Sequence, residues 1–209
     1  MLVKDIMHKN PHTVTTGTTL EEAYRVMQES RFRHLPVLEG GRLVGVVTDR
    51  DLRLATSTLA PIPFPAGALV GDMMTRDPRT AGLLDPVEDA ARVMRELKIG
   101  CLPVVDGGEL LGIVTGIDLL DALLLLTGVG NASSRIEVEL ADRPGELCRL
   151  TGFFSERNIN IHSLLTYPDT PDRVRTVLRI GSIEARLLAD GLRQAGFEVV
   201  WPPAKPWHR

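Results

Sequence analysis

The pattern of hydrophobic and polar positions in the first half of the chain predicts short helices and strands in a fixed order. Apolar residues at helical spacing follow Thr19, which can cap a helix, with Glu22 at the capping-box position. Two short apolar runs then have the character of strands, and Gly40-Gly41 between them suits a hairpin turn. The expected elements are a helix over 20–27, strands over 35–38 and 43–48, and a helix from Asp49.

This order of elements occurs twice. When the sequence is shifted by about 67 residues, VKDIM at Val3 aligns with VGDMM at Val70, and HLPVLEGGRLVGVVTDRDL aligns with CLPVVDGGELLGIVTGIDL. In the second copy Pro86, after Asp85, is expected in the first turn of a helix. The other expected elements are the helix stripe Val87, Ala90, Ala91 and Met94, strands over 102–105 and 110–115, and a helix from Gly116.

The repeat also predicts how the first part of the chain packs. A unit of about 50 residues is too small to bury a strong core alone, so the two copies should pack face to face around a pseudo-twofold axis, with two related clefts between them. The Pro-rich, aperiodic segment 55–67 is the expected connector. The expected divisions are 1–60 for the first unit, 61–127 for the second, 128–134 for a linker, 135–201 for a C-terminal domain and 202–209 for a tail.

The C-terminal third changes pattern. Residues 135–140 alternate polar and apolar positions, as a half-buried strand does, and the order of elements that follows is βαββαβ, the ferredoxin-like plan. The fold class expected for the whole chain is therefore α/β (α+β). The predicted strands are 135–140, 159–167, 173–180 and 197–201, with a turn over 168–172, and the predicted helices are 146–156 and 182–195, the latter closed by Gly196.

Composition narrows the possible partners and the compartment. A net charge of −3 and a pI near 6.0 give no reason to expect nucleic acid or an anionic membrane as partner. The two cysteines, Cys101 and Cys148, form no paired motif, and no metal-ligand cluster is evident. The most apolar run, 119–126, is too short to span a bilayer, and the first residues lack the apolar stretch of a signal peptide. A cytoplasmic protein is expected.

The sharpest chemical feature is a Thr-x-x-Asp motif that follows a Gly-led apolar strand. It occurs as Thr48 with Asp51 and again as Thr115 with Asp118. The Thr can cap the helix that begins there, the free N–H groups of the first turn favour an anion, and the Asp can accept hydrogen bonds from a vicinal diol such as a ribose. An ordinary capping box has the same spacing, but two copies in register favour binding.

The duplicated unit resembles a tandem pair of CBS domains, also called a Bateman module, over about residues 1–125. The resemblance implies that the Thr and Asp contact phosphate and ribose of an adenosine nucleotide (AMP, ADP or ATP), and that the strand around His-Leu-Pro-Val lines the adenine slot. No cofactor is required, and Mg²⁺ would arrive only with the nucleotide. The implied first site is Thr13, Val14, Arg33, His34, Leu35, Pro36, Thr48 and Asp51, and the second is Thr80, Ala81, Gly100, Cys101, Leu102, Pro103, Thr115 and Asp118.

The cationic residues around the two motifs differ. Arginine forks suit phosphate oxygens, so the first copy is expected to hold a phosphorylated nucleotide better. The second copy would hold a less charged adenosine compound or stay empty. The alternative is that these arginines only form a solvated face. The first copy has Arg31, Arg33, His34, Arg50 and Arg53, where the second has Lys98, Gly100, Cys101, Ile117 and Leu120.

The segment Asp142-Arg143-Pro144-Gly145-Glu146-Leu147, followed by RNINI at 157–161, resembles an ACT domain. That resemblance implies a small amino-acid-like effector, because the Gly allows close approach of a ligand and the helix N-terminus can receive a carboxylate. The alternative is that Pro-Gly only makes a tight turn and the domain serves to dimerise. The candidate effector contacts are Asp142, Pro144, Gly145, Glu146 and Leu147.

The whole arrangement is similar to the acetoin-utilisation AcuB-type proteins. It implies a regulatory homodimer without catalytic residues, in which nucleotide and effector shift a conformational equilibrium read by an unknown regulated protein. Two other classes stay open: an oligomerisation scaffold with vestigial pockets, and a small nucleotide-acting enzyme. A nucleophilic triad of Cys148, His162 and Asp142 can be drawn, but Cys148 is expected to be a small core residue in a helix.

Overall fold

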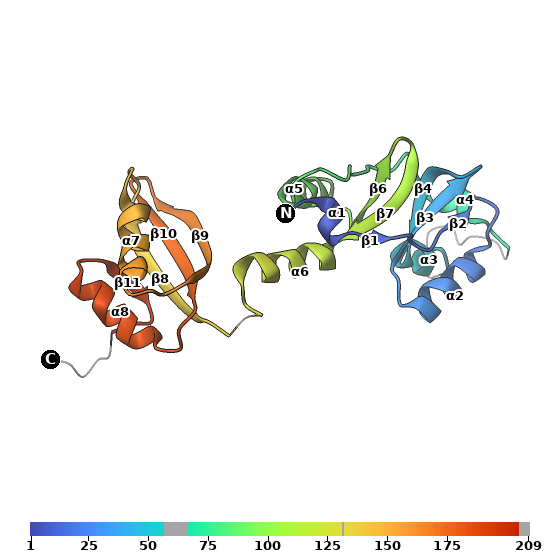
Figure 1. Cartoon of the computed structure of the whole chain (residues 1–209). Coiled ribbons are helices and arrows are strands. Elements are labelled where there is room, and N and C mark those ends of the chain that lie inside the picture. The colour runs from blue at the N-terminus through green and yellow to red at the C-terminus, as the bar shows by residue number, and fades with distance from the viewer. Residues whose placement is uncertain (57–66, 131, 205–209) are drawn as a thin grey trace. The chain divides into compact units, whose positions relative to one another are not determined.

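The computed structural model describes residues 1–56, 67–130 and 132–204 (Figure 1). The chain forms two compact units, Met1–Ala122 and Leu123–Arg209, and each is described here by itself. Within the described ranges, no helix combines the length and apolar character needed to cross a membrane. Most of the expected connector lies in 57–66, outside the described residues, although its first two positions, Ala55 and Thr56, belong to a helix.

The first unit contains two small sheets, one for each copy of the repeat. Each has an antiparallel hairpin at its centre, as the Gly-Gly turns predict. The first sheet has the order β2 (Val14–Thr15), β3 (His34–Glu39), β4 (Arg42–Thr48), β5 (Thr75–Arg76), and the second has the order β1 (His8–Lys9), β7 (Glu109–Thr115), β6 (Cys101–Asp106). The helices are α1 (Val3–Ile6), α2 (Leu20–Ser30), α3 (Asp49–Thr56), α4 (Val70–Met73), α5 (Val87–Leu97) and α6 (Gly116–Thr127), whose last turns pass into the second unit.

The two copies exchange their N-terminal segments. Strand β1 pairs with β7 of the second copy, with His8 opposite Ile113, and β5 pairs with β4 of the first copy, with Thr75 opposite Val46. The repeat offset relates His8 to Thr75 and Val46 to Ile113, so the two pairings are equivalent. The pseudo-twofold relation predicted from the repeat is confirmed in the strand pairing.

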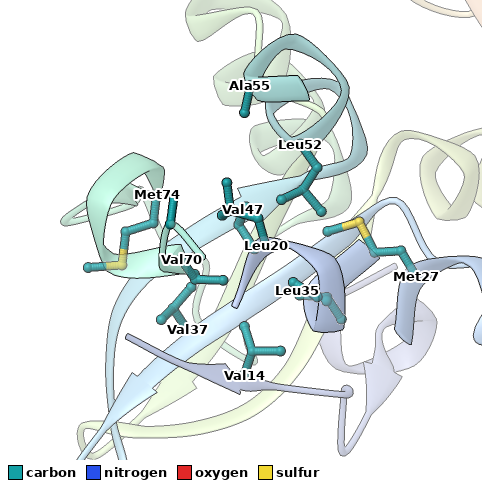
Figure 2. Packing of buried hydrophobic residues seen from close by; sticks show 12 residues of the cluster. Val14, Leu20, Met27, Leu35, Val37, Val47, Leu52, Ala55, Val70 and Met74 are labelled. Atoms are coloured by element: carbon teal, nitrogen blue, oxygen red, sulfur yellow. The ribbon is translucent and has the colours of Figure 1, made fainter. Parts of the chain in front are cut away.

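The hydrophobic cores show the same exchange. In the first core, Val70 and Met74 of the second copy pack with Leu35 and Met27 of the first (Figure 2). In the second core, Val3 packs among residues of the second copy and is 0% exposed. Each core is therefore completed by a segment that the linear order assigns to the other copy. The domain boundaries expected from the sequence stay a prediction.

Local sequence explains where the helices begin and end, with one correction. The Thr19 hydroxyl accepts a hydrogen bond from the Glu22 amide at 3.2 Å, as the capping-box spacing predicts. Pro86 was expected in the first turn of α5, but it lies at the N-cap with an extended ψ of 141°. The Asp85 carboxylate instead accepts a hydrogen bond from the Gly82 amide at 2.8 Å, which fixes the turn before the helix.

The second unit is a four-stranded antiparallel sheet with the order β11-β8-β10-β9. This is the strand order of the ferredoxin-like plan, which confirms the predicted fold class. Strand β9 runs to Thr170, so the turn is shorter than the predicted 168–172. Gly196 closes the second helix with a φ of +81°. The elements are β8 (Ser134–Ala141), α7 (Glu146–Ser155), β9 (Ile161–Thr170), β10 (Arg173–Ile180), α8 (Ala185–Gln194) and β11 (Glu198–Trp201).

The segment exchange predicts that the first residues of the chain stabilise the second core. We expect Val3→Ala to lower the free energy of unfolding by about 1–2 kcal/mol, because it removes buried methyl groups and leaves a cavity. Urea denaturation measures the change. The control Leu84→Ala, at a side chain that is 67% exposed, should change the free energy of unfolding by less than about 0.5 kcal/mol. Equal effects of the two substitutions would contradict the exchange.

Candidate functional site

A cavity of about 820 Å³ lies between the two copies in the first unit. The first copy contributes the end of β4 with its Thr-x-x-Asp motif and the start of β3. The second contributes the segment that follows β5 and the segment that precedes β6. The lining residues used below are Arg33, His34, Thr48, Arg50, Asp51, Thr75, Asp77, Arg79, Lys98, Gly100 and Cys101.

Thr48 and Asp51 hold each other in place at the wall of this cavity. One oxygen of Asp51, Oδ2, accepts hydrogen bonds from the Thr48 amide at 3.0 Å and from the Thr48 hydroxyl at 2.7 Å. The Asp51 amide in turn donates to the Thr48 hydroxyl at 3.2 Å. Thr48 and Asp51 therefore form the hydrogen bonds of a capping box, but these use only one of the two Asp51 carboxylate oxygens. The other, Oδ1, accepts no hydrogen bond from the described residues and can accept from a ligand.

Cations from both copies gather in the cavity. Arg33 and Arg50 come from the first copy, and Arg79 and Lys98 come from the second. Among the described residues these four form no ion pair, whereas Arg53 pairs with Asp49 at 2.9 Å. Guanidinium and ammonium groups directed at one space suit the oxygens of a phosphate.

A histidine and a glycine from opposite copies meet inside the cavity. A Cβ atom at Gly100 would lie 2.5 Å from Nε2 of His34, so only glycine leaves room for this imidazole. Burial, and then the charge of Arg33, lower the pKa of His34 below its ordinary value, against the smaller opposing effects of Asp51 and Asp49. The imidazole is therefore neutral near pH 7 and can both donate and accept a hydrogen bond.

The structure brings only part of each predicted site to the cavity. Arg33, His34, Thr48, Arg50 and Asp51 line it, and they are joined there by Gly100 and Cys101, which had been grouped with the other motif. The prediction grouped the residues by copy, whereas this cavity combines residues of both copies, because the exchange brings the second copy to the first motif. Which of them contact a ligand stays a prediction. Of the other predicted residues, Val14, Leu35, Pro36, Ala81, Leu102 and Pro103 are buried, and Thr13 and Thr80 are exposed outside the residues that line this cavity.

The second motif has the same internal geometry. Asp118 Oδ2 accepts hydrogen bonds from the Thr115 amide at 2.6 Å and from the Thr115 hydroxyl at 2.7 Å. Its other oxygen, Oδ1, lies 2.9 Å from Nε2 of His8. The carboxylate of the second motif thus has a partner, His8, whose counterpart the first motif lacks within residues 1–56, 67–130 and 132–204.

Sequence reasoning missed the contribution of Thr75, Asp77 and Arg79. They follow or belong to a strand of two residues, and a strand so short gives no periodic signal. The repeat could have indicated them, because they stand one to five positions before Thr80, which was among the predicted site residues. The sequence did not indicate which of the two Thr-x-x-Asp motifs this segment would face in the fold.

The loop predicted to contact an effector lies at the start of α7. Asp142, Pro144, Gly145 and Leu147 are exposed, and Gly145 has a φ of +94°, which favours glycine. Glu146 differs, because it is buried and both of its carboxylate oxygens are already bound. Whether the loop contacts an effector stays a prediction.

Two arginines hold the Glu146 carboxylate. Arg143 donates to Oε1 at 2.9 and 2.7 Å, and Arg149 donates to Oε2 at 3.2 and 2.8 Å. These hydrogen bonds hold the pKa of Glu146 below its ordinary value. The expectation for Cys148, two residues on, was wrong: the thiol is exposed, because the core side of α7 is formed by Leu150 and Phe154.

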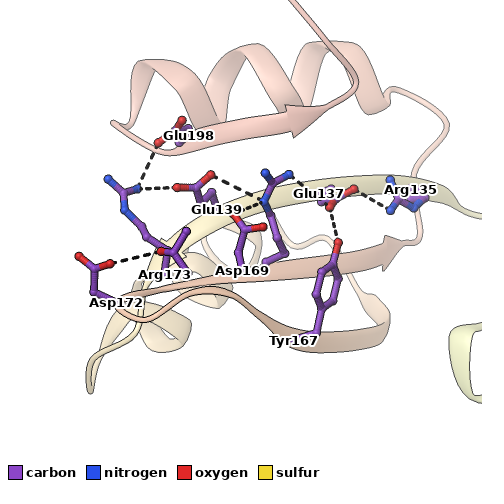
Figure 3. A network of polar contacts seen from close by, with 10 residues as sticks. Arg135, Glu137, Glu139, Tyr167, Asp169, Asp172, Arg173 and Glu198 are labelled. Carbon is purple, nitrogen blue, oxygen red and sulfur yellow. Dashed lines mark hydrogen bonds and ion pairs between the residues drawn. The ribbon is translucent and has the colours of Figure 1, made fainter.

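Ion pairs cover the face of the second unit's sheet opposite its helices (Figure 3). Tyr167 donates to Glu137 at 2.7 Å and Arg135 donates to the other oxygen of Glu137 at 2.7 Å, while Arg175 pairs with Asp169 at 3.0 Å. Burial opposes the ionisation of Glu137, but the hydrogen bonds from Tyr167 and Arg135 and the nearby charge of Arg175 outweigh it. They hold the pKa of Glu137 below its ordinary value.

Two α/β repeats that exchange segments, followed by a ferredoxin-like domain, define a modular α/β protein with a cavity between the repeats of its first module. The chain belongs to the CBS-domain family: the CBS domain model matches residues 3–57 and 70–125, and the ACT domain model matches residues 134–194. The predicted resemblance to a CBS pair with a C-terminal ACT domain is confirmed.

Relatives match mainly in the CBS pair. A CBS domain-containing protein of Dictyostelium discoideum is 39% identical over 137 residues, covering 59% of this chain and 92% of the relative. Inosine-5'-monophosphate dehydrogenase of Korarchaeum cryptofilum is 38% identical over 56% of this chain, but the match covers only 22% of that enzyme. The similarity to the enzyme is thus confined to its CBS region.

Solved structures match the same module. The CBS domain pair of protein MJ0100, in complex with 5'-methylthioadenosine and S-adenosyl-L-methionine, is 30% identical with a TM-score of 0.54, covering 63% of this chain and 98% of that one. CBSX2 in complex with AMP is 34% identical with a TM-score of 0.53, covering 62% and 98%. A Vibrio cholerae protein designated for acetoin utilization, AcuB, is 29% identical with a TM-score of 0.56, covering 62% and 96%.

The cavity wall should make one cysteine unreactive. Burial raises the pKa of the Cys101 thiol to about 12, so almost no thiolate forms at pH 8. We expect iodoacetamide to add once to the native chain, at the exposed Cys148, and twice after denaturation, as counted by intact-mass spectrometry. Modification of Cys101 and Cys148 at equal rates in the native protein would contradict the burial.

The sheet-face network predicts a shift in acid stability. A carboxyl whose folded pKa is lowered stabilises the fold above its unfolded pKa, and this contribution is lost as pH falls through the folded pKa. Tyr167→Phe removes one hydrogen bond, so the pKa of Glu137 should rise and acid unfolding of the second unit should begin at higher pH. NMR titration of Glu137 and circular dichroism against pH measure both effects. Tyr24→Phe, the matched change in the first unit, should leave both unaltered.

Proposed function

We propose that this chain is a regulatory protein that senses an adenosine nucleotide in the cavity beside Thr48 and Asp51. The observation that carries the proposal is the pairing, in one cavity, of a carboxylate oxygen suited to a ribose diol with cations suited to phosphate. The solved CBS pairs that bind AMP, 5'-methylthioadenosine and S-adenosyl-L-methionine support this ligand class, since adenosine is common to all three.

The charges favour a phosphorylated ligand over adenosine itself. The four cations that lack an ion pair among the described residues come from both copies, so a phosphate bound between them would link the copies together. AMP, ADP and ATP all meet this requirement, with Mg²⁺ present only when the nucleotide carries it. The predicted site residues Thr48, Asp51, Arg33 and Arg50 are proposed as direct contacts.

Regulation requires that ligand binding at one site change the affinity or conformation of a second site. We propose a cytoplasmic homodimer in which nucleotide in the CBS cavity, and an amino-acid-like effector at the exposed loop of Asp142, Pro144, Gly145 and Leu147, favour one of two conformations. The four exposed leucines from Leu123 to Leu126 support an interface between copies. Glu146 is proposed as an organiser of that loop, since Arg143 and Arg149 already occupy its carboxylate.

We further propose that the protein acts in acetoin or acetate use. The support is the likeness to the protein designated AcuB, which covers the CBS pair. No catalytic step is assigned, and the chain is proposed to act through the protein that reads its conformation.

Calorimetric titration with AMP, ADP and ATP tests the nucleotide site. We expect at least one of them to bind, and we expect Arg33→Ala and Arg50→Ala each to weaken binding about tenfold, because each removes a charge-assisted hydrogen bond to phosphate. Arg25→Ala, an exposed arginine on α2 away from the cavity, is the matched control and should bind as the wild type does. Unchanged affinity in both cavity variants, or no binding of any of the three nucleotides, would refute the proposal and favour a scaffold.

A further inference from the structure

The two Thr–Asp pairs differ in what lies over the carboxylate. In both, Oδ2 of the Asp is held by the Thr amide and hydroxyl. In the second, His8 Nε2 contacts Oδ1 of Asp118 at 2.9 Å, and Asp118 is only 6% exposed. Among the described residues, all hydrogen bonds of Asp51 go to Thr48. The first pair thus keeps an acceptor for a ligand, and the second does not.

The residue responsible comes from the exchanged segment. His8 lies on β1 opposite Ile113, and its equivalent Thr75 lies on β5 opposite Val46. The two positions therefore present their side chains to equivalent places, Thr75 to the cavity before Asp51 and His8 to Asp118. A threonine leaves the carboxylate accessible, whereas the longer imidazole reaches it, with Nε2 of His8 2.9 Å from Oδ1 of Asp118.

A second difference involves His12, which follows the exchanged strand β1, and Phe32, which follows α2. His12 and Phe32 stand at the positions equivalent to Arg79 and Ile99, which line the first cavity. Their rings lie against each other, with centroids 5.1 Å apart. The equivalent of Arg79 is thus a histidine ring close to a phenylalanine ring, and Gly100 and Ile117 stand where the first copy has Arg33 and Arg50. A phosphate would therefore find fewer cations at the second motif.

We propose that His8 excludes adenosine ligands from the second Thr–Asp pair and makes this chain a sensor with one nucleotide site per chain. A ribose diol needs the carboxylate oxygen that His8 occupies, so a ligand can bind Asp118 only by displacing the imidazole. His8 has a side chain that is 67% exposed, so displacement is a competition and the exclusion is graded, on the order of tenfold in affinity. The inference rests on the proposed function for its ligand class.

The test exchanges the two equivalent residues. His8→Thr gives the second motif the side chain of the first, and Thr75→His does the reverse. Native mass spectrometry and calorimetry with AMP, and separately with adenosine, count the ligands per chain. We expect His8→Thr to bind one more equivalent of at least one probe than the wild type, and Thr75→His to bind AMP about tenfold more weakly.

His8→Ala is a second route to the same opening, and circular dichroism reports whether each variant is folded. Lys9→Ala, at the neighbouring exposed position of β1, is the matched control and should keep the wild-type stoichiometry. The idea fails if the folded His8→Thr and His8→Ala variants gain no equivalent of either probe. It also fails if the wild type binds two equivalents with equal affinity.

The outcome for the wild type separates this inference from the proposed function. If the wild type binds no nucleotide while His8→Thr binds one equivalent, the proposed function is refuted and the role of His8 stands. If the wild type binds one and His8→Thr still binds one, with the same affinity, the nucleotide site stands and the role of His8 is refuted.

Discussion

The antiparallel pairing of β1 with β7 and of β5 with β4 is the constraint on which the first unit depends. Each pairing carries a segment of one copy into the sheet and core of the other, so neither copy can close its core alone. Val3 and Val70 are fully buried as a result, although each belongs by sequence to the copy whose core it does not enter. The cavity between the copies depends on the same exchange, since Thr75, Asp77, Pro78 and Arg79 of its wall arrive with β5 or directly after it.

The two copies have equivalent backbones but different side chains at equivalent positions. Equivalent strands, equivalent motifs and equivalent left-handed residues, such as Arg31 and Lys98, recur in both copies. Side chains differ between the copies, and among them are those of the exchanged strands: Thr75 lines the cavity beside Asp51, and His8 contacts Asp118. Equivalent positions on two strands of the same length and pairing thus place an imidazole against Asp118 and a threonine beside Asp51.

The sequence predicted the features that depend on local patterns and missed those that depend on tertiary packing. The hairpins, the helix caps and the order βαββαβ follow from local patterns, since Gly-Gly turns, Thr19 and alternating positions act over a few residues. The grouping of Gly100 with Asp51, the contact of His8 with Asp118 and the exposure of Cys148 depend on tertiary packing. The repeat predicted two clefts, but sequence periodicity does not indicate which copy contributes the residues that line each cleft.

The charge distribution gives the cavity a physical reason to respond to its ligand. Arg33, Arg50, Arg79 and Lys98 line one space between the two copies, and none of them forms an ion pair with another described residue. Asp49, Asp51 and Asp77 line the same space, where the cations outnumber the carboxylates. A phosphate between these cations would add attraction across the junction. Because any ligand that binds only the folded arrangement stabilises it in proportion to the logarithm of its concentration, nucleotide would tighten the junction between the copies. The signal would then be the closeness of that junction, since β4 lines the cavity and contributes Val47 to the first core, and Thr75 of β5, which lines the cavity, directly follows Met74 of that core.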